Sequence, residues 1–388
     1  MSRLEELIQQ YCPDGVEYKK LGDVLSVNRG RRLTKMQLSD DGQYYVYHGS
    51  KDTPLGKYSQ FNVKGNTTIV VNTGGIGGVK FCDDDFWCSD GSFWIGHSDL
   101  LNDKFVYYYL SPLEPYFASQ KRVGGVPTID RSVVENVEIP VPPLPVQEEI
   151  VRILDNFAEL QAELQAELQK RLQQYNYYRD NFFLFEGRTD VEWKKLGDVA
   201  SIKTGRRFVR TDIRESGVPC FHYGDIYTYY GLTATTTKGY LDAELASKLR
   251  FAQPNDVVVV CAGENDMDIG VGVAWLGNEP AVVHDACCIL HHDQNPRYIS
   301  HFLRTHNYHL QMKKYVKNGK ISSLPSSGLA NALIPIPSLE EQERIATILD
   351  KFYALTTDIT AGLPAEIEAR RKQYEYYRDL LLTFKQKA

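Results

Sequence analysis

The chain has 388 residues, of which 43% are hydrophobic and 24% are charged, and its formal net charge is −6. This length is ample for more than one buried core, and we expect two or three domains. No apolar run approaches the length of a membrane span, and the start, MSRLEELIQQ, lacks the apolar centre of a signal peptide. These features exclude membrane and secreted proteins and predict a cytoplasmic protein, whose seven irregularly placed cysteines are reduced thiols.

The first stretch of the chain is repeated near its middle. A short amphipathic helix carrying Leu4, Leu7 and Ile8 is predicted at the start. The phrase that follows, from Val16, is VEYKKLGDVLSVNRGRRL, and its counterpart from Val191 is VEWKKLGDVASIKTGRRF. Two copies of one phrase in a single chain predict two similar halves.

A long helix is predicted between the two phrases. It follows IPVPPLP at Ile139, and its apolar residues recur at steps of three or four from Gln147 to Phe185. Such a helix is roughly 58 Å long at about 1.5 Å per residue. Its apolar stripe is narrow, which is typical of a spacer helix that packs against a partner helix. Three AELQ tetrads, from Ala158, Ala162 and Ala166, form an ordinary leucine seam and also suggest a ruler whose length sets a spacing.

The partner helix is predicted at the end of the chain. From Ile334 the sequence IPIPSLEEQERIATILDKFYAL matches the segment from Ile139, and QYEYYRDLLLTF from Gln373 matches QYNYYRDNFFLF from Gln174. The second copy is four residues longer between these matches, which is close to one helical turn. Gly362 predicts a kink or break there, together with a nearby proline. Joined head to tail, the two halves would close into a ring with pseudo-twofold symmetry.

The remaining two segments, residues 16–137 and 188–332, are rich in β-branched, aromatic and turn residues. Each predicts a strand, a glycine-rich loop and a hairpin return, in TTIVVNTGGIGGVKF and DVVVVCAGENDMDIGVGVAWL. Each also ends in a second glycine loop, RVGGVPTID or KNGKISSLP, before the proline phrase. We therefore expect an α+β protein with two β-rich α/β globular domains separated by two long antiparallel helices. The expected boundaries are residues 1–137, 138–187, 188–332 and 333–388.

Charge is divided unevenly between these segments. The two β-rich segments together are neutral, so the helical segments supply the whole net charge of −6. A negative total therefore does not argue against a nucleic-acid partner, because basic residues can gather on one face of each domain. The candidates for such a face are Arg29, Arg31, Arg32 and Lys35, with Arg206, Arg207 and Arg210 at matching positions.

The combination of these motifs resembles the specificity subunit of type I restriction-modification systems. The resemblance rests on the two LGDV phrases, the two proline-preceded helices ending in Tyr-Tyr-Arg-Asp, and the two unlike segments between them, and it covers essentially the whole chain. It implies two target recognition domains, each recognising half of a bipartite site in double-stranded DNA. It also implies that paired helices set the gap and dock two methyltransferase subunits, to which two restriction subunits add. S-adenosylmethionine, ATP and Mg would be used by those partners, with no cofactor on this chain.

The motifs of an enzyme are missing from the sequence. The nearest match to the Asn/Asp-Pro-Pro-Tyr/Phe motif of adenine methyltransferases begins at Asn295 and lacks the second proline, and no phosphate-binding GxxxxGK[ST] occurs. The glycines between Gly74 and Gly78 are typical of a tight hairpin. The residues from His284 to Asp293 include histidines and cysteines, but Cys287 and Cys288 fit a buried strand better than a zinc site. We therefore expect a non-catalytic chain without a metal.

DNA contacts require donors for phosphates and for base edges. The alternative for any one candidate is a solvated surface residue or a buried tyrosine. Because both copies share the arginine pairs, phosphate positioning is their expected role, since shared residues cannot recognise two different half-sites. A rival interpretation of the chain is a coiled-coil scaffold with two protein- or glycan-binding modules and no DNA role. The candidate DNA-binding residues are Arg31, Arg32, Tyr45, Tyr47, His48, Lys51, Lys121 and Arg122 in the first segment, and Arg206, Arg207, His222, Tyr223, Lys317 and Lys320 in the second.

Overall fold

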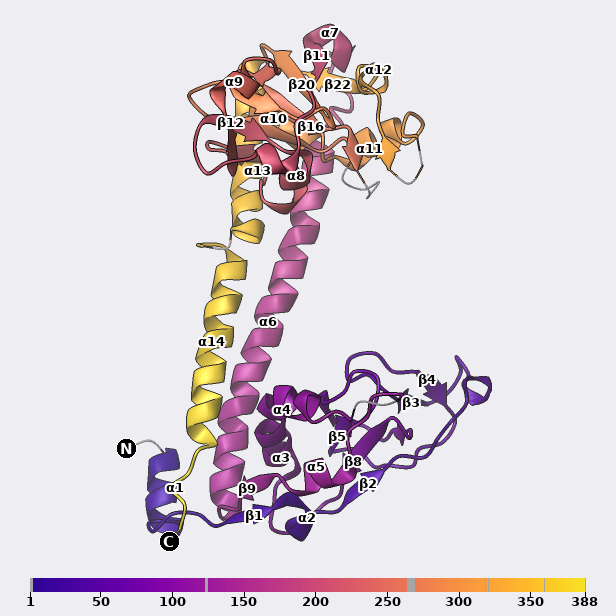
Figure 1. The fold of residues 1–388 in the computed structure, drawn as a ribbon, viewed down its shortest axis with the longest axis vertical. Helices are drawn as coiled ribbons and strands as arrows, with labels where there is room; N and C mark the ends of the chain where they lie inside the picture. The colour runs from indigo at the N-terminus through magenta and orange to yellow at the C-terminus, as the bar shows by residue number, and fades with distance from the viewer. Residues whose placement is uncertain are drawn as a thin grey trace. The chain divides into compact units, whose positions relative to one another are not determined.

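The computed structural model describes residues 3–122, 125–263, 269–317, 319, 321–358 and 360–387. The chain forms two compact units, which are treated separately below (Figure 1). Unit 1 contains residues 1–164 and 367–388, and unit 2 contains residues 165–366. Within the described ranges, no helix combines the length and apolar composition needed to cross a lipid bilayer.

Unit 1 contains a four-stranded and a three-stranded sheet besides the two-stranded pairing of β1 (Tyr18–Lys20) with β9 (Glu138–Pro140), and α3, α4 and α5 lie beside the four-stranded sheet (Figure 1). The larger is antiparallel, with the strand order β2-β8-β5-β6, and the smaller has the order β4-β3-β7. The hairpin predicted around the first glycine-rich loop is confirmed, because β5 pairs antiparallel with β6. The strands are β2 (Val27–Arg29), β3 (Tyr44–Tyr47), β4 (Gly56–Tyr58), β5 (Thr67–Val71), β6 (Val79–Cys82), β7 (Trp87–Cys88) and β8 (Ser92–Ile95). The helices are α1 (Arg3–Tyr11), α2 (Leu21–Val24), α3 (Asp103–Leu110), α4 (Glu114–Ser119) and α5 (Arg131–Glu135).

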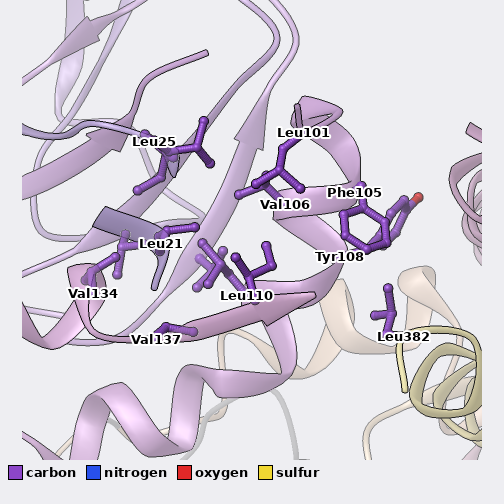
Figure 2. Close-up of a cluster of buried hydrophobic side chains, with 14 of the residues drawn as sticks. Leu21, Leu25, Leu101, Phe105, Val106, Tyr108, Leu110, Val134, Val137 and Leu382 are labelled. Atoms are coloured by element: carbon purple, nitrogen blue, oxygen red, sulfur yellow. The ribbon is translucent and has the colours of Figure 1, made fainter. Parts of the chain in front are cut away.

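The core of unit 1 lies between the larger sheet, the short helices and the long helix. Leu21 of the LGDV phrase is fully buried and packs in one cluster with Phe105 and Leu110 of α3 (Figure 2). Leu382, from the far end of the chain, belongs to the same cluster. Leu4 of the predicted N-terminal helix is buried there as well, which confirms that α1 is an amphipathic element.

Unit 2 repeats this plan with more strands. Its two largest sheets have the orders β11-β20-β16-β18-β13 and β14-β12-β19-β15, and β16 and β18 form the second predicted hairpin. The strands are β11 (Ala200–Thr204), β12 (Val218–Phe221), β13 (Thr233–Ala234), β14 (Gly239–Leu241), β15 (Phe251–Ala252), β16 (Val257–Val260), β17 (Ala262–Gly263), β18 (Gly272–Trp275), β19 (Ala281–Val283), β20 (Cys287–His292) and β21 (Ser322–Ser323). The helices are α7 (Leu196–Val199), α8 (Tyr223–Thr228), α9 (Ala243–Ala246), α10 (Pro296–Phe302), α11 (His306–Met312) and α12 (Ser326–Leu329).

The long central helix, α6 (Leu144–Phe182), has 39 residues and contributes to both units. The predicted length is confirmed, but both predicted ends were three residues too late. The helix begins earlier because Pro145 occupies its first turn, where a missing backbone N–H costs nothing. Two helices, α13 (Leu339–Thr357) and α14 (Leu363–Leu381), form the second copy, so the predicted break is confirmed. Gly362 lies at the break, where a Cβ would stand 2.7 Å from the carbonyl oxygen of Ala354.

The helices pack antiparallel within each unit. In unit 1, the ring of Phe157 on α6 stacks on Tyr377 of α14, with centroids 5.6 Å apart, and also meets Tyr374. In unit 2, Tyr178 on α6 stacks on Phe352 of α13 at 5.5 Å. The partner-helix prediction is therefore confirmed separately in each unit.

The same backbone and side-chain hydrogen bonds recur separately in each unit. In unit 1, β1 (Tyr18–Lys20) pairs antiparallel with β9 (Glu138–Pro140), and in unit 2, β10 (Glu192–Lys195) pairs in the same register with β22 (Leu333–Ile336). Gln147 donates to the carbonyl oxygen of Pro142 at 2.6 Å, and the matching Gln342 donates to Pro337 at 2.9 Å. The repeated phrases therefore encode repeated contacts.

The end of the chain packs beside its beginning in unit 1 (Figure 1). The backbone N–H of Val16 donates to Lys385 at 2.8 Å, and that of Lys387 donates back to Val16 at 2.9 Å. The hydroxyl of Tyr18 donates to the carbonyl oxygen of Phe384 at 3.2 Å. The predicted head-to-tail closure is confirmed by these contacts.

Candidate nucleic-acid interface

In unit 1, several loops meet at one end of the larger sheet. Its strands are antiparallel, so the loop after β2, the loop after β5 and the turn before β8 emerge at the same edge. The backbone N–H of Asn72 donates to the carbonyl oxygen of Gly91 at 3.0 Å, and the backbone N–H of Ser89 donates to that of Tyr47 at 3.0 Å. We call this surface the unit 1 loop face. It consists of Gly30–Arg32, His48–Ser50, Asn72–Gly75, Ser89–Gly91, Arg122 and 125–128.

The arginine pair of the first phrase lies on the unit 1 loop face. A Cβ at Gly30 would stand 2.1 Å from the carbonyl oxygen of Ser89, so only glycine fits where the two loops touch. The backbone of Arg31 is fixed on both sides, because its N–H donates to Cys88 at 2.9 Å and its carbonyl accepts from the Trp87 indole at 2.7 Å. Arg31 and Arg32 are exposed. Their guanidinium groups have no ion-pair or hydrogen-bond partner among the described residues.

Unit 2 repeats this arrangement. A Cβ at Gly205 would stand 2.2 Å from the carbonyl oxygen of His284, and Arg206 donates its backbone N–H to Val283 at 3.0 Å. The guanidinium of Arg206 donates to the carbonyl oxygen of Lys248 at 2.8 Å, while Arg207 is exposed. We call the corresponding surface the unit 2 loop face. It consists of Gly205–Arg207, His222–Gly224, Cys261–Gly263, His284–Ala286, Lys317 and 321–323.

The second glycine loops complete both faces. The backbone of Arg122 forms a β-bridge with Thr128, which forms another β-bridge with Thr73 of the loop after β5. At the corresponding place in unit 2, Lys317 pairs with Ser323, whose strand β21 pairs with β17. Arg122 also forms an ion pair with Asp130. Lys121 and Lys317 are exposed, and Lys320 lies outside the described residues.

The predicted histidines occupy matching positions but different surroundings. His48 Nδ1 accepts from the backbone N–H of Gly91 at 3.1 Å and lies 3.2 Å from the Ser89 hydroxyl. The ring of His222 instead packs against His284, with centroids 4.8 Å apart, and against Tyr223 at 4.7 Å. Serine in unit 1 is therefore replaced by an imidazole in unit 2.

A cavity of about 370 Å³ opens on the unit 2 loop face. Burial lowers the pKa values of His222 and His284, so both rings are neutral at neutral pH and can each donate and accept hydrogen bonds. Exposed Arg207 and Arg210 lie beside them together with exposed Asp285, so the rim of the cavity carries more positive than negative charge. The residues lining it are Arg207, Phe208, Val209, Arg210, His222, Tyr223, Ala262, Gly263, His284, Asp285, Ala286 and Ile321.

The structure does not bring four of the predicted residues into the unit 1 loop face as defined above: Lys121, Lys51, Tyr45 and Tyr47. Lys51 follows the face in sequence, but its ammonium is held by Glu114 at 2.7 Å and lines a different cavity, against α3 and α6. Tyr45 and Tyr47 lie on strand β3, where Lys57 stands 5.3 Å from the Tyr45 ring. Burial is the main cause that raises the pKa of Tyr47 to about 12, so its hydroxyl stays protonated.

Four residues of the two faces were not among the predicted DNA-binding residues. Ser89 and Asp90 precede β8, and His284 and Asp285 take their places in unit 2. The signal that could have found them is the repeat itself, because aligning the proline phrases also aligns these two turns.

Metal chemistry has no cluster of ligands in the described part of the chain. No group of three or more His, Cys, Asp or Glu side chains there converges on a common point. Cys287 and Cys288 lie on the buried strand β20, as the sequence predicted, and His291 is engaged by Asp256 at 2.7 Å. Burial raises the pKa of Cys287 well above its ordinary value, which keeps that thiol protonated.

The comparisons with known proteins agree with this geometry. Residues 13–174 and 189–369 each match the family described as the type I restriction modification DNA specificity domain. The EcoR124I/EcoR124II specificity subunit of Escherichia coli is 36% identical over 295 residues, covering 72% of this chain and 70% of that protein. A candidate type I specificity subunit of Haemophilus influenzae is 30% identical over 397 residues, covering 95% and 96% of the two chains.

Solved structures share the fold. The type I S subunit of M. genitalium superposes with a TM-score of 0.55 and 17% identity, covering 95% of both chains. A structure from work on assembly and conformational transition of the type I restriction-modification system gives 0.58 and 19%, covering 95% and 97%. Two similar α/β domains with matching loop faces, joined through shared helices, define a class of duplicated recognition proteins. Within that class, the chain belongs to the type I restriction modification DNA specificity family.

Proposed function

We propose that this chain gives a type I restriction-modification complex its DNA sequence specificity. Each loop face recognises one half of a bipartite site in double-stranded DNA, and the paired helices set the gap between the halves. The chain itself has no catalytic role.

One observation supports this proposal most directly: the two loop faces have the same backbone arrangement and carry different side chains. Both place an arginine pair after a glycine that touches the neighbouring loop, which suits phosphate contacts that do not depend on sequence. The positions beside the pair differ, with Ser89 in unit 1 and His284 in unit 2. Side chains with different hydrogen-bonding groups select different base edges.

We further propose that the helices dock two methyltransferase subunits, to which two restriction subunits add. The exposed tyrosines Tyr177 on α6 and Tyr376 on α14 occupy matching positions in the repeat, so two copies of one partner could bind equivalent surfaces. Methyl transfer from S-adenosylmethionine, and DNA cleavage driven by ATP with Mg, belong to those partners.

Methylome sequencing tests the proposal. A host expressing this chain with its methyltransferase subunit is compared with a host expressing the methyltransferase alone. We expect a bipartite motif with methylated adenines in both halves only when this chain is present. Replacing residues 16–137 with those of a related chain should change one half of the motif and leave the other unchanged. If the complex assembles and no motif appears, the protein- or glycan-binding alternative is favoured instead.

A further inference from the structure

Each loop face carries an exposed aliphatic side chain, Val126 in unit 1 and Ile321 in unit 2. We infer that these two residues make apolar contacts with DNA bases in their respective half-sites. The inference rests on the proposed function, and it adds to the charged and polar candidates a kind of contact that the arginine pairs cannot make.

The two residues occupy one position of a repeated loop. In both loops the backbone of the first basic residue, Arg122 or Lys317, forms a β-bridge with a hydroxyl residue six positions later. Val126 and Ile321 both stand two positions before that hydroxyl residue, although the residues around them differ. A β-branched aliphatic side chain is therefore kept although the residues directly before and after it differ between the two loops.

Packing does not account for this choice. The next shared aliphatic position, Ile129 or Leu324, is 3% or 2% exposed and belongs to the core of its unit. Val126 is 76% exposed and Ile321 is 62% exposed. Burial in the chain's own core therefore explains the aliphatic residues at 129 and 324. It gives no structural reason for those at 126 and 321.

The surroundings of the two side chains indicate their partner. Ile321 lines the same cavity as exposed Arg207, Arg210 and Asp285, so a ligand that fills the cavity meets two guanidinium groups and one carboxylate. Val126 belongs to a loop that is tied through Thr128 to Thr73, next to the turn at Gly91. In unit 2, an apolar side chain beside two guanidinium groups fits a polyanion that also offers apolar surface. Duplex DNA does so, through base faces and the thymine methyl group.

The salt dependence of binding separates this contact from phosphate contacts. A lost phosphate contact reduces the slope of log affinity against log salt by about one, because fewer counterions are released. An apolar contact releases no counterion. Ile321→Ser should therefore weaken binding about tenfold at every salt concentration and leave the slope unchanged. Arg207→Gln should reduce the slope.

The experiment uses the full chain in complex with its methyltransferase subunit. The probe is a duplex carrying the motif that the wild-type complex methylates, and a scrambled duplex measures non-specific binding. Ile321→Val keeps a smaller aliphatic group and should bind nearly as the wild type does. Leu310→Ser is the matched control, since Leu310 is 56% exposed in unit 2 and does not line the cavity. Val126→Ser and the exposed Leu100→Ser form the same pair in unit 1.

The expected result is a loss of affinity for the motif in Ile321→Ser and Val126→Ser alone, with an unchanged salt slope. Wild-type affinity in both serine variants would overturn the inference, as would a loss of affinity that comes with a reduced slope. Loss of methyltransferase assembly in these variants would also overturn it, because the residues would then belong to a protein interface. If the wild-type complex shows no preference for its motif over the scrambled duplex, the proposed function fails as well, which distinguishes the two failures.

Discussion

In each unit, an aspartate at the equivalent helix position binds polar side chains of the globular domain. In unit 2, Asp350 on α13 accepts from Arg297 at 2.6 Å and is bonded to His301 at 2.8 Å. In unit 1, the matching Asp155 on α6 accepts from Lys104 and from the hydroxyl of Tyr108 at 2.6 Å. The aspartate is kept while both of its partners change, so the helix side of this contact is fixed and the domain side varies.

Asp350→Ala should loosen unit 2. His301 is fully buried, and removal of the carboxylate leaves its Nε2 without its partner. An unsatisfied buried polar group costs about 1–3 kcal/mol, which native-state hydrogen exchange on α10 and α13 would measure. Exposed Asp198→Ala, in the same unit, should change the free energy of opening by less than about 0.5 kcal/mol. Equal protection of α10 in the two variants would contradict this expectation.

The cost of Asp350→Ala should also depend on pH. Burial opposes ionisation of Asp350, but hydrogen bonds from His301 and Arg297 outweigh it, so the pKa of Asp350 lies below its ordinary value. A carboxylate whose pKa is lowered on folding stabilises the folded state above its unfolded pKa of about 4. That stabilisation is lost as the pH falls through the folded pKa. The difference between wild type and Asp350→Ala should therefore shrink below about pH 4.

Duplication decided which single residues could be predicted. The arginine pairs and the histidines His48 and His222 fall at matching positions of the two copies, and the structure places all of them on the loop faces. Lys51 differs, because Glu114, far away in sequence, binds its ammonium. Such a partner is set by tertiary packing, and local sequence around Lys51 carries no trace of it. The surroundings of His222 depend in the same way on His284.

At the scale of elements, α6 is continuous whereas its partner is divided into α13 and α14. Along the AELQ tetrads, Leu160 and Leu164 are half-buried while Ala158 and Ala162 are exposed. In the second tetrad only the leucine is partly covered, whereas Gln161 of the first tetrad and Glu167 of the third are half-buried as well. Removing the second tetrad keeps the leucine spacing and changes the length of the helix.

Deletion of residues 162–165 should change the gap of the recognised motif. It shortens α6 by about 6 Å and rotates the residues that follow by about 40°. At about 3.4 Å per base pair, the preferred gap should shift by one or two base pairs, and both half-sites should stay the same. Methylome sequencing of the deletion variant measures the gap. Glu163→Ala combined with Gln165→Ala keeps the length and is the matched control. An unchanged gap in the deletion variant would rule out the ruler hypothesis.

Periodicity predicted the elements well but not their ends. The apolar stripe of α6, the break at Gly362 and both glycine-loop hairpins were visible in the sequence, because each depends on residues close together in the chain. The start of α6 was misplaced, since Pro145 looked like a boundary and lies inside the first turn. The meeting of five loops on each face could not be predicted, because it depends on bonds between distant segments, such as Thr73 with Thr128.

At the scale of the whole molecule, the connection between the end of a long helix and the repeated phrase is made differently in the two units. In unit 2, α6 leads through the backbone into the phrase that begins at Val191. In unit 1, the phrase at Val16 follows the short helix α1, and the end of α14 reaches it only through noncovalent contacts. Phe384 is partly buried against the unit 1 core. The closure of the repeat therefore depends on the last few residues of the chain.

Truncation after Leu382 should destabilise unit 1 alone. It removes both backbone hydrogen bonds of Val16 to Lys385 and Lys387, the bond from Tyr18, and the packing of Phe384. At about 1 kcal/mol for each hydrogen bond and a similar contribution from the ring, we expect a loss of roughly 2–4 kcal/mol in local stability. Native-state hydrogen exchange should show faster exchange along β1 and β9, whereas β10 and β22 of unit 2 serve as the internal control. If exchange along β1 were unchanged, the contacts at Val16 would not stabilise the join, and α1 with the LGDV phrase would fold without them.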